Sequence, residues 1–132
     1  MRLMCWNGRG LNDPGKRSQV INRVASLRLT VFALLEMHVR LEKECQVAQA
    51  FPQFDHFASF VEGTNGRVWV FWDPSSCSMD ILHATSYFVH YRAGLLLIWS
   101  SLRLSMLLTL FCFVDLYGKI RDFLVLLMRL GV

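Results

Sequence analysis

Apolar and polar residues alternate in short blocks over the first part of the chain, and the blocks have the periods of strands and helices. Residues 2–6 and 29–35 are short apolar runs, so we predict a buried strand at each. Between them, residues 16–27 carry apolar side chains at the spacing of one helix face, which predicts an amphipathic helix. This apolar stripe comprises Val20, Ile21, Val24 and Leu27.

The next blocks predict a second helix followed by antiparallel strands. A polar helix is expected from about residue 40 to residue 50, and Pro52 ends it. Strands are expected over 57–61 and 68–72. The linker between them contains Asn-Gly at 65–66, a hairpin signal because both residues tolerate positive φ.

Two more strand candidates follow a turn at residues 73–76. They cover residues 79–82 and 87–90. The order strand, helix, strand, helix and then hairpins is typical of an α/β sandwich with a mixed sheet. We therefore predict one α/β unit over residues 1–92.

The composition changes near residue 93, so we divide the chain into residues 1–92 and a leucine-rich tail over 93–132. Residues 93–114 are long enough to span a bilayer as a helix and carry one charge, Arg103. We expect an apolar helical tail. Two explanations stay open for it: a membrane helix over 93–114, and an out-of-frame translation of the preceding genetic element.

Charge and cysteine content narrow the class of protein only a little. The 132 residues carry a net charge of +4, which is compatible with a polyanionic partner, but the basic residues are scattered. Four cysteines occur without a C-x-x-C pair or zinc-ligand spacing. Without a secretory signal, the expected location is intracellular, nuclear or cytoplasmic, with a membrane as the alternative.

Two polar residues stand where apolar strands are expected to end. Asn7 follows the first strand and Glu36 follows the second. Strand ends are where ligand sites form in α/β folds, and a carboxylate there could hold Mg²⁺. The plainer interpretation is a turn-forming asparagine and a solvated loop glutamate.

Three segments resemble, in order and at natural spacing, motifs of one protein family. WNGRGLN at 6–12 resembles the opening W-N-x-R-G-L-N loop of endonucleases encoded by non-LTR (LINE-type) retrotransposons, particularly plant ones. VFALLEMHV at 31–39 resembles their strand ending L-x-E-T-K, and NGRVWVFWDP at 65–74 resembles their N-G-R-I-W-x-x-W-D-P hairpin. The resemblance covers residues 1 to about 92.

The resemblance implies a fold and a chemistry. It implies a partial four-layer α/β sandwich of the exonuclease-endonuclease-phosphatase type, with DNA as partner. By resemblance, Asn7 and Glu36 are catalytic residues of a common divalent-ion site. Asn7 positions the scissile phosphate and the nucleophilic water, and Glu36 binds a catalytic Mg²⁺. The implied reaction is metal-assisted phosphodiester hydrolysis.

The sequence departs from the family in ways that bear on activity. Met37 and His38 replace the usual threonine and lysine. The later G-D-x-N and S-D-H motifs do not occur. Groups that act as a unit are strongly non-additive, so we expect a truncated endonuclease without useful activity.

Trp69 and Trp72, three apart on a strand, should face opposite sides, with at least one in the core.

Two alternative functions stay open. The first is a small single-span membrane protein anchored through 93–114. The second is a weak nucleic-acid-binding module. Its expected contacts are Arg9, Lys16, Arg17 and Arg67.

Overall fold

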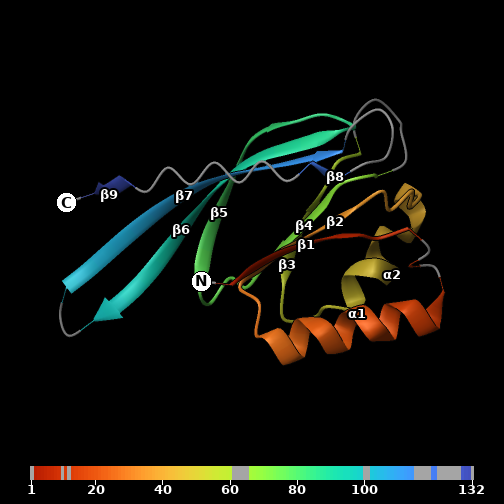
Figure 1. Ribbon diagram of the computed structural model, residues 1–132, viewed down its shortest axis with the longest axis horizontal. Helices are drawn as coiled ribbons and strands as arrows, with labels where there is room; N and C mark the ends of the chain where they lie inside the picture. Colours follow the sequence, from red (N-terminus) through yellow and green to blue (C-terminus); the bar gives the residue numbers. More distant parts are fainter. Residues whose placement is uncertain are drawn as a thin grey trace.

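The computed structural model of the chain is drawn in Figure 1. It describes residues 2–9, 11, 13–60 and 66–94 with their side chains, and the backbone alone over 95–99, 102–114, 120–121 and 129–131. Asn65, half of the Asn-Gly hairpin signal, lies outside the described residues, as do Gly10 and Asn12 of the first motif.

The chain opens with a strand–helix–strand unit. Strand β1 (Leu3–Asn7) is parallel to strand β2 (Val31–Leu35), and helix α1 (Pro14–Leu27) connects them. Asp13 caps the helix by accepting a hydrogen bond from the backbone N–H of Gly15, with proline in the first turn. The pairing runs in register from Leu3–Val31 to Asn7–Leu35, so both strands end at the same edge of the sheet.

Two further strands complete the first sheet. The 3₁₀ turn η1 (Leu41–Lys43) and helix α2 (Glu44–Gln49) lead to strand β3 (Asp55–Ala58), which pairs antiparallel with strand β4 (Trp69–Trp72). Strand β4 also pairs antiparallel with β2, giving the order β1-β2-β4-β3. Strand β2 therefore has a partner on each side.

A second sheet begins after the turn at residues 73–76. Strands β5 (Cys77–Ala84), β6 (Phe88–Trp99) and β7 (Leu102–Val114) pair antiparallel in that order. The short strands β8 (Ile120–Arg121) and β9 (Arg129–Gly131) both pair with β7.

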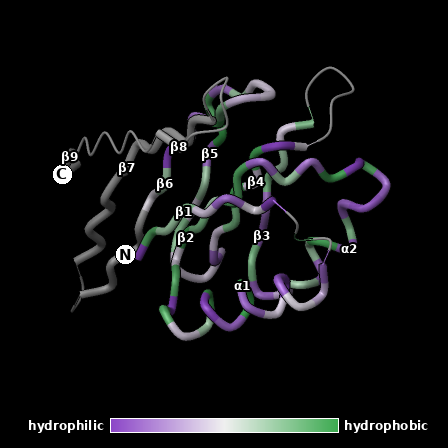
Figure 2. The backbone as a smooth tube through the Cα atoms, turned by 45° about the vertical axis from the view of Figure 1, so that its right-hand side comes forward, coloured by the Kyte–Doolittle hydropathy of each residue, from purple (hydrophilic) through white to green (hydrophobic). Residues whose placement is uncertain are grey.

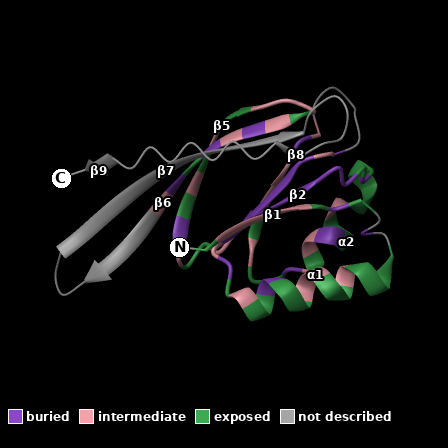
Figure 3. Cartoon of the chain, viewed as in Figure 1, coloured by how far each residue is buried: buried purple, intermediate pink, exposed green. Residues whose placement is uncertain are grey.

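The first sheet has a separate hydrophobic core on each of its faces. Alternation along β2 sends Phe32 and Leu34 into the core under helices α1 and α2. Val31, Ala33 and Leu35 point to the other face, against Val89 and Tyr91 of the second sheet. Figures 2 and 3 show hydrophobic, buried residues along β2 and β4 and exposed polar ones on α1.

Aromatic rings fill the core beneath the helices. Phe32 stacks on Phe71 with ring centroids 4.7 Å apart and an interplanar angle of 7°. Phe51, two residues after the end of α2, packs against both rings. Trp69 lies in this core, whereas Trp72 packs against the core on the other face, which confirms that they point to opposite sides.

The structure confirms a mixed α/β chain and most of the predicted elements of its first part. The apolar stripe of the first helix faces the core, and the predicted antiparallel pair is β3 and β4. Among the residues that the structure describes, no helix combines the length and apolar character that a membrane crossing requires.

The tail is where the predicted secondary structure was wrong. We expected an apolar helix over 93–114, but the described residues of this stretch, 93–99 and 102–114, lie in β6 and β7. These strands pair over twelve positions from Phe88–Phe113 to Trp99–Leu102. A leucine-rich run without a polar period fits a helix or a buried strand equally well, and pairing decides between them. The compositional boundary near residue 93 falls inside β6.

The aromatic core supplies the first testable prediction. Phe32 is fully buried, and Phe32→Ala removes the ring that stacks on Phe71, so we expect a loss of about 3–5 kcal/mol in the free energy of unfolding. Urea denaturation followed by circular dichroism measures it. Leu41→Ala, at a side chain that is 62% exposed, is the matched control and should stay within about 0.5 kcal/mol of the unchanged protein. Equal losses in the two variants would contradict this core.

Candidate functional site

The candidate site lies at the edge of the first sheet where β1 and β2 end. Because these strands are parallel and in register, Asn7 is the last residue of β1 and pairs with Leu35, directly before Glu36. Strand β4 is antiparallel to β2, so its beginning, at Trp69, meets the same edge. Residues that follow β1 and β2 or precede β4 therefore gather here (Figure 1).

Asn7 and Glu36 are in direct contact across the two strands. The side-chain amide of Asn7 donates to Glu36 Oε2 at 3.3 Å. The Asn7 Oδ1 atom in turn accepts a hydrogen bond from the backbone N–H of Arg9 at 2.9 Å. Glu36 is only 8% exposed, whereas Asn7 lies at the surface. The structure thus brings together the two residues that the sequence singled out.

A backbone irregularity places the Glu36 carboxylate. Between the pair Leu34–Trp69 and the pair Val39–Gly66, the segment that follows β2 advances five residues, whereas the segment that precedes β4 covers three. The segment after β2 therefore contains two extra residues. Glu36 and His38 lie in this stretch with φ of 55° and 47°, in the left-handed region that non-glycine residues rarely adopt. Such bulges redirect side chains and are frequent beside functional sites.

The loop after β1 is packed onto the loop after β2. The Gly8 N–H donates to the Leu35 carbonyl at 2.6 Å, which continues the strand pairing by one step. A Cβ atom on Gly8 would collide with the Met37 side chain, so a larger residue fits there only if Met37 moves. Met37 is 3% exposed and belongs to the core. Met37 therefore packs against the loop that follows Asn7.

The expected basic residues are distributed around this edge. Arg9 Nε lies 3.8 Å from Glu36 Oε2, and its side chain is 75% exposed. The Glu36 side chain, by contrast, is only 10% exposed, so the ion pair joins an exposed cation to a nearly buried carboxylate. Arg17 donates from Nε to the Leu11 carbonyl at 3.2 Å and ties α1 to the first loop. Lys16 lies exposed in the first turns of α1, and the Arg67 carbonyl accepts from the Met37 N–H.

The Glu36 carboxylate is the group at this edge that could bind a divalent cation. Mg²⁺ prefers oxygen ligands and is often held by one or two carboxylates, with water and phosphate oxygens completing its shell. Glu36 supplies one carboxylate, and the Asn7 amide donates to it. Among the residues that the structure describes, no cluster of three His, Cys, Asp or Glu side chains could hold a metal ion.

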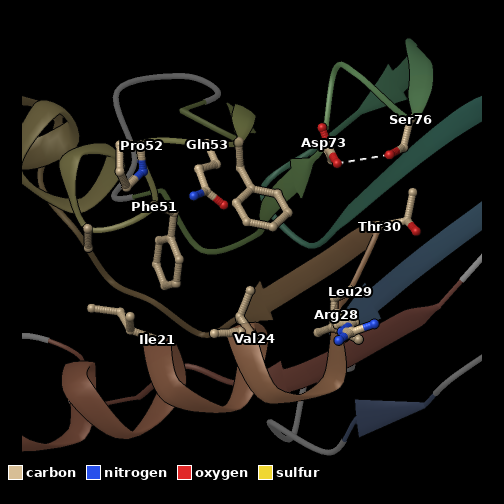
Figure 4. Close-up of a pocket in the computed structure, with 13 residues that line it drawn as sticks. Ile21, Val24, Arg28, Leu29, Thr30, Phe51, Pro52, Gln53, Asp73 and Ser76 are labelled. Atoms are coloured by element: carbon tan, nitrogen blue, oxygen red, sulfur yellow. Dashed lines mark hydrogen bonds between the residues drawn. The ribbon is translucent and has the colours of Figure 1, made fainter.

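A cavity of about 580 Å³ lies at the opposite edge of the same sheet, close to residues 28–30 before β2 and Asp73 after β4 (Figure 4). Apolar side chains of α1 and Phe51 line one part of it, and Asp73 and Ser76 lie across from them. The sequence did not point to this cavity because its lining comes from stretches far apart in the sequence, at residues 21–30, 50–54 and 73–76.

Asp73 organises the turn between the two sheets. Its carboxylate accepts hydrogen bonds from the Ser75 hydroxyl at 2.6 Å, the Ser75 N–H at 2.9 Å and the Ser76 hydroxyl at 2.9 Å. The Ser75 hydroxyl has the largest effect and lowers the pKa of Asp73 below its ordinary value of 3.8, with partial burial acting in the opposite direction. The aspartate thus stabilises the turn in its ionised form.

Comparisons with known proteins do not assign the chain. No protein-family model matches it, and no curated protein matches it.

The left-handed backbone at Glu36 supplies the second prediction. Glu36→Val and Glu36→Asn both remove the contact with Arg9, but a β-branched residue is strained at a φ of 55°, where asparagine is tolerated. We expect the valine variant to be less stable than the asparagine variant by about 1–3 kcal/mol. Chemical denaturation of both proteins measures the difference. If valine is tolerated as well as asparagine, the strand end does not adopt this conformation.

The Asp73 turn supplies a prediction about pH. A carboxylate whose folded pKa is lowered stabilises the fold fully above its unfolded value of 3.8 and loses this effect as the pH falls through the lowered pKa. Ser75→Ala removes the strongest donor, so the pKa of Asp73 should rise toward the ordinary value. NMR titration of the carboxyl carbon reports it, and Ser78→Ala, on the exposed side of β5, is the control. An unchanged titration in the Ser75 variant would exclude this hydrogen bond.

Proposed function

We propose that the chain carries part of a metal-assisted DNA phosphodiester hydrolase of the exonuclease-endonuclease-phosphatase type, derived from a non-LTR retrotransposon endonuclease. The single observation that supports it most is the 3.3 Å contact between the Asn7 amide and the Glu36 carboxylate at the shared end of β1 and β2. The three sequence motifs lead to the same assignment. Under this proposal the two sheets are the inner layers of a four-layer sandwich.

In this site Glu36 holds Mg²⁺, whose chemistry is to stabilise the negative charge that develops on phosphate oxygens during hydrolysis. Asn7 keeps the carboxylate oriented through its amide and contacts a phosphate oxygen of the strand. Arg9, which pairs loosely with Glu36 and is largely exposed, can turn to the phosphate at little cost. Burial of the Glu36 carboxylate excludes water from one side and strengthens its attraction to a cation.

We expect no useful nuclease activity from these 132 residues. Among the residues that the structure describes, Glu36 and Asn7 are the carboxylate and the amide in contact at this edge. The G-D-x-N and S-D-H motifs that complete the family's site do not occur in the sequence. Groups in such a set act as a unit, so two of them do not retain a proportional share of the rate. What the chain retains is the ability to attract a divalent ion and a phosphate backbone.

Nucleic-acid binding without cleavage is the second candidate function. Arg9 and Arg67 lie at the edge that carries Asn7 and Glu36, and Arg17 contacts the loop that follows β1. Cations on one edge attract a phosphate backbone independently of base sequence and in a salt-dependent way. This function requires none of the missing motifs.

Metal binding at Glu36 can be tested directly. Titrating the isotope-labelled chain with Mn²⁺, a paramagnetic stand-in for Mg²⁺, should broaden the NMR signals of residues around Asn7 and Glu36 first. Glu36→Gln should abolish this selective broadening because it removes the buried carboxylate at this edge. Glu42→Gln, at an exposed glutamate of η1, is the matched control and should leave it unchanged. Broadening that survives Glu36→Gln would contradict the metal site.

A nicking assay on supercoiled plasmid tests the expected inactivity. With Mg²⁺, the purified chain should nick no faster than its Glu36→Gln variant, because the chemical step lacks its other groups. Nicking that the substitution removes would overturn the claim of inactivity while supporting the family assignment.

A further inference from the structure

Tyr87 is a large aromatic residue that the fold holds at the surface. It is 42% exposed, and it lies in the tight turn between β5 and β6. The Thr85 hydroxyl accepts from the N–H groups of Tyr87 at 3.2 Å and Phe88 at 3.3 Å, and the Thr85 N–H donates to the Phe88 carbonyl at 2.9 Å. These bonds fix the backbone, so the exposure of the ring follows from the shape of the turn.

The guanidinium of Arg67 lies over this ring. Its central carbon is 5.3 Å from the centroid of the Tyr87 ring, within the range of a cation–π interaction. In the part of the chain that the structure describes, the ion pairs involve other residues, and no carboxylate neutralises Arg67. The ring contacts the side chain without neutralising its positive charge.

The backbone ties Arg67 to the candidate site. The Arg67 carbonyl accepts from the Met37 N–H at 3.1 Å, and Gly66 exchanges two hydrogen bonds with Val39. Met37 directly follows Glu36, so the bulge that positions the carboxylate also fixes the base of the Arg67 side chain. The backbone of Arg67 and the Asn7–Glu36 pair therefore lie at one edge of the sheet.

We propose that Arg67 contacts a backbone phosphate of a nucleic-acid strand and that Tyr87 is the residue that positions it. The proposal rests on the proposed nucleic-acid function and adds to it a second anchoring point beside Asn7 and Glu36. A guanidinium presents several N–H donors in a planar fork that matches phosphate oxygens. Contact with the ring restricts the arginine before binding, so less side-chain freedom is lost when the phosphate binds.

Anisotropy of a short labelled DNA duplex, titrated without Mg²⁺ over a range of salt concentrations, tests the role of Arg67. Arg67→Gln should bind several-fold more weakly, and the slope of log affinity against log salt should fall by about 0.9, the value for one lost phosphate contact. Arg23→Gln, at an exposed residue of α1, makes the same change in charge and should keep the slope. Equal slopes in the two variants would overturn the proposal.

Two variants of Tyr87 test the positioning role. Tyr87→Phe keeps the ring under the guanidinium and should bind DNA as the unchanged protein does. Tyr87→Leu keeps an apolar side chain but no ring, and it should lose several-fold in affinity while Arg67 keeps its charge. A leucine variant that binds as well as the phenylalanine variant would show that the ring does not position Arg67.

The outcomes separate this proposal from the function on which it rests. If Arg67→Gln binds normally while neutralising Arg9 and Lys16 weakens binding, nucleic-acid binding stands and the Arg67 contact is wrong. If the unchanged chain does not bind the duplex even at low salt, the nucleic-acid function fails, and this proposal fails with it.

Discussion

The pairing of β2 with a strand on each side is the constraint on which the rest of the structure depends. All five residues of β2 are buried, since one face lies under the helices and the other against the second sheet. A strand buried on both faces reads as a continuous apolar run, which VFALL is. Its end is therefore a sharp boundary, and the first polar side chain beyond it, Glu36, emerges at the edge of the core with little exposure to solvent.

The chemistry of the site follows from that boundary. A nearly buried carboxylate is costly unless polar groups face it, and here Asn7 and Arg9 do so from the neighbouring strand end. Arg67 lies at the same edge. After the two extra residues that follow β2, Val39 pairs with Gly66, next to Arg67. One carboxylate, one amide and two arginines make an arrangement suited to a divalent ion and phosphate oxygens, and this is the basis of the proposed function.

Much of the first sheet could be predicted because local patterns determine it. The helical stripe at Val20, Ile21, Val24 and Leu27 and the apolar run of β2 are visible without knowledge of the fold. The structure adds that the two strands pair in parallel, as strands joined by one helix can, and this pairing brings Asn7 to Glu36. Elements of the second sheet were predicted as strands as far as residue 90, where apolar and polar residues still alternate.

The rest depends on contacts between distant parts of the chain. The left-handed backbone at Glu36 and His38 arises from pairing with residues 66–67, about thirty positions away in sequence, and no local signal encodes it. In the sequence, Met37 is an apolar residue where the resembling motif has threonine. Its packing role becomes visible only in the fold, where its side chain lies against Gly8. In the tail, the high leucine content suggested a helix. The long pairing of β6 with β7 is what identifies these two segments as strands.

The contact between the Asn7 amide and the Glu36 carboxylate is the central claim, and the nuclear Overhauser effect measures it most directly. In the folded, isotope-labelled chain, the side-chain amide protons of Asn7 should show cross-peaks to the Cγ protons of Glu36, alongside backbone cross-peaks between β1 and β2. Backbone cross-peaks that establish the parallel pairing, without any between these two side chains, would show that the strands deliver them to different places.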